Sequence, residues 1–334
     1  MEENGETPAH LLPVHGYQEH AGGRALVSIA WLSTRSEYWP LPPRHREPLL
    51  GIAYLQFGVG AGGVEWLARL ACSSWFAGLE AQTDDLAVSG GVSEGRWAVP
   101  NGSADRKASR VTPEAFFMPE ALPAAWFAMV AVPCGTGQAG QAAALGLVGA
   151  LRARRDPGGR ALGVVVTVDA VRSAATDAFV GSLLDKGAFV VRPAARTGVG
   201  VTSDHLHHLP LRTLTNPRQG QLVGVDFADY RQVWRPGRVA DLHVVPFAGG
   251  DAAAALRGMS LPEEGSVRAL TIGFHLNLNA PDLRLVDVDR FATACRERLL
   301  APDGEVVFTT MDRLDGVTEL VDLLVIHDSA EAAK

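Results

Sequence analysis

Two glycine-rich runs and one pair of carboxylates are the parts of this sequence that could do chemistry. The runs are GVGAGG at residues 58–63 and CGTGQAG at residues 134–140. Glycine leaves backbone N–H groups open, so such a run before a helix can hold a phosphate without a side chain in the way. Asp226 and Asp229 lie three residues apart and would share one face of a helix.

Each glycine run follows a predicted strand and begins a predicted helix. The strands are residues 49–57 and 126–132, and apolar residues recur at helical spacing after each run. A third unit has a strand at 161–167, a helix ending at Gly187 and a closing strand at 189–192. This alternation predicts an α/β fold with a doubly wound parallel sheet, whose ligands bind at the carboxyl ends of the strands.

The sequence changes character after residue 222. Strands are predicted at residues 241–247, 267–278, 305–310 and 319–326, with one helix at 288–300, which is typical of an α+β domain. We therefore expect an N-terminal extension (1–47), a nucleotide-binding domain (48–200), a connecting helix and loop (201–222) and a C-terminal domain (223–330). Within the extension, residues 25–32 fit one strand or one helix.

Composition excludes several classes of protein. The 334 residues include 30 basic and 37 acidic side chains, and a net charge of -7 disfavours a nucleic-acid partner. The 3 cysteines form no disulfide or zinc pattern, which fits a reducing cytoplasm. The sequence has no apolar run near the roughly 20 residues that span a bilayer.

Three parts of the chain resemble the FtsZ and tubulin family. Residues 216–229 (NPRQGQLVGVDFAD) are similar to the family's synergy loop, and residues 135–137 match the GTG kernel of its glycine signature. Residues 273–278, 281–289 and 306–312 resemble the strand, helix start and strand of its activation domain. The resemblance spans about residues 50–327.

The resemblance implies a cytoskeletal protein that binds GTP or GDP, with Mg²⁺ compatible, and assembles head to tail into filaments of itself. Asp226 and Asp229 would orient the attacking water in the pocket of the next subunit, and Asp204 would lie under the base. A membrane or protein adaptor stays open as a further partner. The phosphates would lie on residues of the two runs: Gly58, Gly60, Ala61, Gly62, Gly63, Gly135, Thr136, Gly137 and Gln138.

Departures from the family pattern predict weak or altered hydrolysis. Gly224 stands where the family carries Asn, and Pro133 and Cys134 replace flexible glycines. Losing one hydrogen-bonding group typically costs on the order of a hundredfold in rate. The alternative is a non-hydrolysing scaffold of the same fold. A Rossmann oxidoreductase would explain the first glycine run, but neither the VDFAD element nor the C-terminal domain.

Each of these features also has a purely structural interpretation. The run at 58–63 could be a tight turn with close packing of helix on strand, and Asp226 could be a helix N-cap. We interpret His205, His207 and His208 as a solvated turn, because no ligand pair with metal spacing lies nearby, and we predict no metal site. Pro210 predicts a broken or shortened connecting helix.

Overall fold

The chain forms two compact units, unit 1 (Met1–Val164) and unit 2 (Val165–Lys334). The computed structural model describes residues 14–20, 23–34, 52–71, 125–170, 172–194, 201–215, 227–247, 256–257, 259, 261–276, 285–312 and 320–328. None of the helices in these ranges is long and apolar enough to cross a membrane. The units divide inside one strand, whereas the predicted domain boundary near residue 200 stays a prediction.

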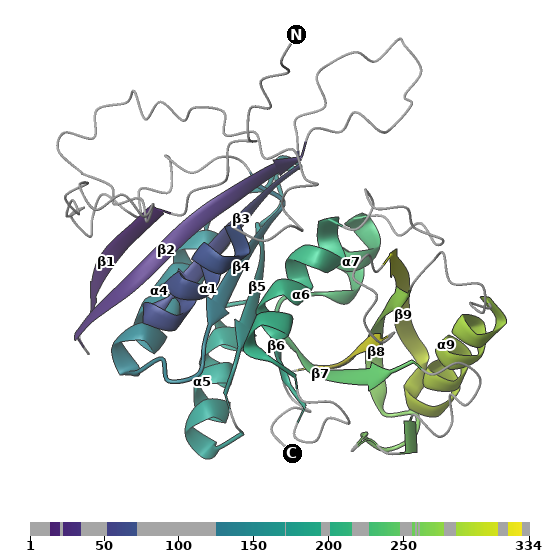
Figure 1. Ribbon diagram of the computed structural model, residues 1–334. Coiled ribbons are helices and arrows are strands. Elements are labelled where there is room, and N and C mark those ends of the chain that lie inside the picture. The colour runs from purple at the N-terminus through teal and green to yellow at the C-terminus, as the bar shows by residue number, and fades with distance from the viewer. Residues whose placement is uncertain are drawn as a thin grey trace, which may run out of the picture. The chain divides into compact units, whose positions relative to one another are not determined.

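In unit 1, strands come both before and after the first glycine run along the sequence (Figure 1). Antiparallel pairing joins β1 to β2 and β2 to β3, and parallel pairing joins β3 to β4. Residues 25–32 thus belong to a strand, and the predicted N-terminal extension supplies part of the sheet. The elements are β1 (Val14–His20), β2 (Gly23–Thr34), β3 (Ile52–Val59), α1 (Gly60–Ala71), β4 (Phe127–Val132) and α4 (Gln138–Arg152).

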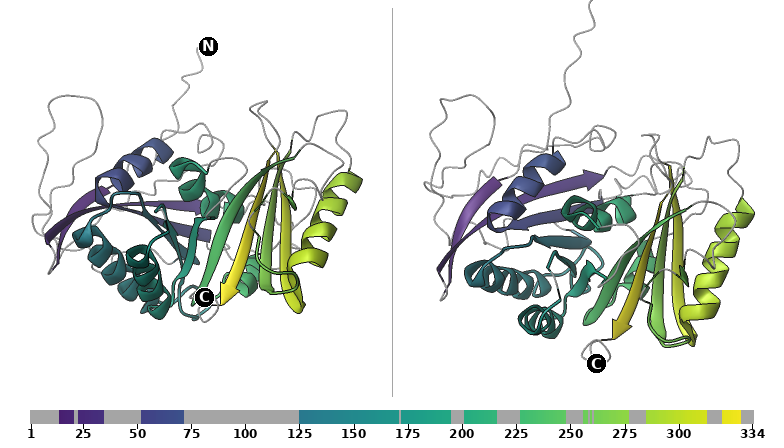
Figure 2. Two further views of the ribbon diagram at one scale, coloured as in Figure 1. Left: turned by 90° about the horizontal axis from the view of Figure 1, so that it is seen from below. Right: turned by 60° about the horizontal axis from the view of Figure 1, so that its bottom comes forward.

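The two helices of unit 1 cover opposite faces of its strands. Gly63 of α1 packs on Gly58, whereas Gly140 of α4 packs beside Val59. Successive residues of a strand point to opposite faces, so α1 and α4 lie on different sides of β3. Figure 2 shows the strands between these helices. This is the doubly wound arrangement that the sequence predicts.

Unit 2 contains a mixed sheet. Parallel pairs join β5 to β6, β6 to β7 and β8 to β9, while β10 pairs antiparallel with both β7 and β8. The C-terminal strands therefore continue the parallel strands of the same unit. The elements are β5 (Gly163–Val168), α5 (Ala174–Asp185), β6 (Phe189–Pro193), α6 (Ser203–Thr215), α7 (Phe227–Val233), β7 (Arg238–Pro246), β8 (Val267–Leu276), α9 (Leu285–Leu299), β9 (Leu300–Asp312) and β10 (Leu320–Asp328).

Helices also cover both faces of the C-terminal strands in unit 2. On the α9 side, the rings of Phe247, Phe274 and Phe291 meet edge to face, with centroids 5.6–6.1 Å apart. On the other side, Trp234 directly follows α7, and its indole N–H donates to the Thr271 hydroxyl at 3.1 Å. Strand residues thus alternate between an apolar face and a more polar one, and the predicted α/β class is confirmed.

The connecting helix differs from the expectation for its proline. Pro210 lies inside α6, which continues to Thr215 instead of ending before the ring. The helix has 13 residues, and Leu206, Leu209 and Pro210 are buried. Burial of this apolar face offsets the lost backbone hydrogen bond that a proline costs in a helix interior.

Phe291→Ala tests the packing of α9. Phe291 is 1% exposed, so we expect the variant to lose about 3–5 kcal/mol of unfolding free energy in urea denaturation. Glu297 on the same helix is exposed, and Glu297→Ala should change stability by less than about 0.5 kcal/mol. Similar losses in both variants would contradict the described core.

Candidate functional site

The two glycine runs lie side by side at the carboxyl ends of adjacent parallel strands in unit 1. Gly58 near the end of β3 pairs with Ala131 near the end of β4, so the chain leaves both strands at the same edge. A Cβ added at Gly60 would lie 3.7 Å from the Thr136 hydroxyl. One added at Gly62 would lie 3.3 Å from Pro133. The structure thus brings together the runs that the sequence singles out.

Gly63 is required for packing. A Cβ at this position would come within 2.7 Å of the Gly58 carbonyl carbon, closer than real side chains approach a backbone. The helix therefore lies directly on the strand. The packing interpretation of this run is correct for Gly63, and Gly60 adopts a φ of 74°, which glycine accepts without strain.

The second run begins with a tight turn from Pro133 to Thr136. Both the N–H and the hydroxyl of Thr136 donate to the Pro133 carbonyl oxygen, at 3.2 and 2.7 Å. Gly135 takes a φ of 79° at the third position of this turn, as a type II turn requires. The Cys134 side chain is exposed at the turn. The Thr136 side chain therefore faces back into the turn.

Sequence reasoning missed two contacts in this arrangement. The Pro133 carbonyl closes the turn, and the Thr136 methyl occupies the space that a side chain at Gly140 would need. The glycine at position 140, in the first turn of the predicted helix, was the available signal.

Both helices that start at the runs have N-termini free of acidic side chains. The first turns of α1 and α4 contain no acid, and Gly137 caps α4 without any side-chain hydrogen bond. Ala61, Gly62, Gly137 and Gln138 are exposed. The unpaired N–H groups and the positive end of the helix dipole favour an anion at such a position. This edge of unit 1 can hold phosphate oxygens.

The predicted acidic residues belong to unit 2. Asp204 lies in the first turn of α6 and is partly buried, while Asp229 lies in the first turn of α7 and is exposed. Asp226 and Gly224 fall outside the described residues, so the N-cap alternative for Asp226 stays open. Asp229 also has an interaction within the described part of the chain.

The three histidines do not form a solvated turn, so that prediction is wrong. All of them lie on α6, and His207 is 1% exposed with its Nδ1 2.6 Å from the Thr167 hydroxyl. His205 instead contacts Asp322 on β10. Amphipathic folding of the helix turns this stretch towards the sheet. Within the part of the chain that the structure describes, no cluster could hold a metal ion.

Asp241 on β7 forms ion pairs with two arginines in unit 2. Arg192, only 4% exposed, donates to Asp241 at 2.9 Å and to Asp177 at 2.9 Å, and Arg172 donates to both oxygens of Asp241. Burial lowers the pKa of nearby His243 to about 4, although Asp241 opposes that shift. Both arginines therefore have acidic partners, and His243 is neutral at pH 7.

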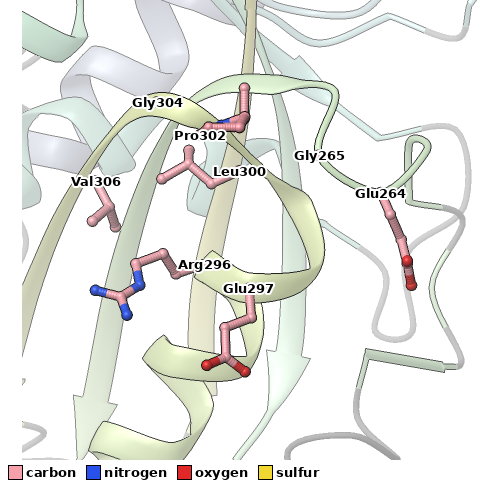
Figure 3. Close-up of a pocket in the computed structure, with 9 residues that line it drawn as sticks. Glu264, Gly265, Arg296, Glu297, Leu300, Pro302, Gly304 and Val306 are labelled. Atoms are coloured by element: carbon pink, nitrogen blue, oxygen red, sulfur yellow. The ribbon is translucent and has the colours of Figure 1, made fainter.

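A separate surface hollow of about 710 Å³ lies at the end of α9 in unit 2 (Figure 3). Arg296 and Glu297 line it together with Leu300 and Pro302. No residue that the sequence predicts for a site is part of this lining. The hollow does not coincide with the candidate site.

Comparisons with known proteins gave structural matches alone. No protein-family model matches the chain, and no curated protein matches its sequence. An FtsZ from M. jannaschii shares 14% identity and a TM-score of 0.47 over 62% of this chain and 67% of that chain. CetZ2 from Haloferax volcanii, described as a GTPγS-bound protofilament, shares 16% identity and a TM-score of 0.42 over 66% of this chain and 74% of that chain.

TubZ from Bacillus thuringiensis serovar israelensis, in GDP-form protofilaments, has 13% identity and a TM-score of 0.43, over 64% of this chain and 64% of that chain. The similarity thus spans roughly two thirds of each protein. These structures are FtsZ, CetZ and TubZ proteins.

Two glycine-to-alanine changes in helices should have opposite effects. In α1, Gly63→Ala places its Cβ against backbone, and we expect a loss of about 1–3 kcal/mol. In α5, Gly181→Ala meets nothing within 4 Å and should gain about 0.5–1 kcal/mol from reduced chain entropy. Thermal and urea unfolding would measure both; a stabilised Gly63→Ala protein would show that α1 does not lie on Gly58.

Proposed function

We propose that this chain is a divergent FtsZ-like protein that binds a guanine nucleotide through the two glycine runs. The supporting observation is the pair of adjacent helix N-termini in unit 1, which begin at Gly60 and Gln138 without an acid in either first turn. Two such ends can share the phosphates of one nucleotide. The guanine preference rests on the family resemblance of residues 135–137 and 216–229.

The two helix N-termini contribute a moderate electrostatic attraction for negatively charged groups. A helix N-terminus stabilises a nearby negative charge by roughly 0.3–1 kcal/mol, and more where the site is partly buried. Two ends acting on a group with several negative charges multiply that contribution. Because the net charge of the protein is -7, local backbone dipoles and not the overall field must attract the nucleotide.

Head-to-tail assembly is the second part of the proposal. Asp229 is an exposed residue, and in a polymer its carboxylate would reach the nucleotide of another subunit. Together with Asp226 it would position the attacking water, which is the main contribution a protein makes to phosphoryl transfer. Gly224 lacks the amide of the family pattern, so hydrolysis would be slow.

Gln138→Glu tests the phosphate site with an almost unchanged shape. Gln138 is exposed at the first residue of α4. A negative charge there would oppose the phosphates, and we expect GDP to bind roughly tenfold more weakly in calorimetry, since a few ångströms separate the charges in a solvated site.

Gln138→Lys is the matched control and should bind GDP at least as tightly as the wild type. Equal affinities in all three proteins would remove this helix end from the site. Failure of the wild type to bind GTP or GDP at millimolar concentration would remove nucleotide binding from the proposal.

Asp229→Asn tests the proposed role of the acid in hydrolysis. The amide keeps the size of the side chain but removes its charge, so GTP turnover should fall by about a hundredfold or more while GDP affinity stays unchanged. Pelleting and negative-stain microscopy should still show linear filaments. The control is Asp303→Asn, an exposed carboxylate that pairs with Arg268.

Unchanged turnover in Asp229→Asn would exclude the assigned role. A wild-type protein that is strictly monomeric by light scattering, with nucleotide and magnesium, would contradict assembly. Filaments without any GTP turnover would instead support the non-hydrolysing scaffold.

A further inference from the structure

Two histidines from different elements share one buried carboxylate in unit 2. Asp322 of β10 is 1% exposed, and its Oδ1 lies 2.6 Å from Nε2 of His205 on α6. Its Oδ2 lies 2.6 Å from Nε2 of His275 on β8. The imidazole rings stand edge to face, with centroids 6.1 Å apart. One carboxylate thus ties a helix to two strands.

The net charge of Asp322, His205 and His275 together depends on how many protons the three side chains carry. Burial raises the pKa of Asp322, but the charges and hydrogen bonds of His275 and His205 outweigh it and hold the pKa far below the usual range. Asp322 is therefore ionised throughout the physiological range. With both imidazoles neutral, a net negative charge would stay buried, which is costly.

One proton on the two imidazoles makes the cluster neutral, and a second would leave surplus positive charge. Hydrogen bonds to an ionised donor are also stronger than neutral ones. The His205 side chain is 17% exposed, whereas the His275 side chain is 2% exposed.

Other titratable side chains lie on α6 and on the elements packed against it. On the helix itself, His207 contacts Thr167, and Asp204 and His208 also have interactions. On the same face of the sheet, Glu305 of β9 pairs with Arg235 and Arg238. From the element that follows, Asp229 and Arg231 of α7 also have interactions, and neither contributes to the charge balance at Asp322.

We propose that His205, Asp322 and His275 form a pH-sensitive latch that holds α6 most firmly against the sheet when one imidazole is protonated. The folded chain then binds more protons than the unfolded chain near neutral pH, so the hold weakens as pH rises and the proton leaves.

Native-state hydrogen exchange tests the latch without any nucleotide, and therefore independently of the proposed function. After correction for intrinsic exchange, the opening equilibrium of α6 amides should increase by up to about tenfold per pH unit where one proton leaves. Amides of α5 serve as the internal reference. Glutamine keeps a donor but cannot be charged, so the slope should be lost in whichever of His205→Gln and His275→Gln replaces the proton-bearing imidazole.

The control is His208→Gln on the same helix, which should keep the wild-type slope. His275→Gln shows which imidazole carries the proton, since the variant of the proton-bearing residue loses the slope. A flat profile in the wild type, or an unchanged slope in both His205→Gln and His275→Gln, overturns the proposal.

If a variant does not fold, NMR titration of both imidazoles in the wild type decides. Retention of one proton to higher pH than in free histidine supports the latch, and ordinary titration of both rings overturns it.

Discussion

The parallel pairing of β3 with β4 is the constraint on which the candidate site depends. It makes two strands end at one edge, so the helices after them begin side by side. That proximity demands small residues, because Gly63 lies on Gly58 and the Thr136 methyl fills the space above Gly140. The same glycines that leave backbone N–H groups open for a ligand therefore also permit the packing. Here, structural and functional requirements select the same residue type.

Much of the fold could be predicted from local pattern. The apolar runs at residues 126–132 and 161–167 become β4 and β5 with shifts of one or two residues at their ends, because strands buried on both faces need continuous apolar sequence. β1 could not be predicted, since residues 14–20 (VHGYQEH) mix polar and apolar types and, among the strands that the structure describes, pair with β2 alone. Pairing partners, not propensity, make this segment a strand.

Only part of the candidate site could be predicted from the sequence. The glycine runs were visible, but sequence could not tell packing from ligand contact at Gly63, which required the position of Gly58. The cluster at Asp322 joins residues 117 and 47 positions apart, so no local spacing could predict it. A lone acid inside the apolar run of β10 was a signal, because a buried carboxylate needs partners.

The exposed thiol of Cys134 gives this protein a built-in place for a spectroscopic reporter. It stands at the turn between β4 and α4, directly beside the groups that would receive phosphate. Cys295 will not compete, because burial raises the pKa of its thiol to about 12. After replacement of Cys72, which lies outside the described residues, a maleimide dye would attach at one position. Its fluorescence could follow occupancy of the loop in real time.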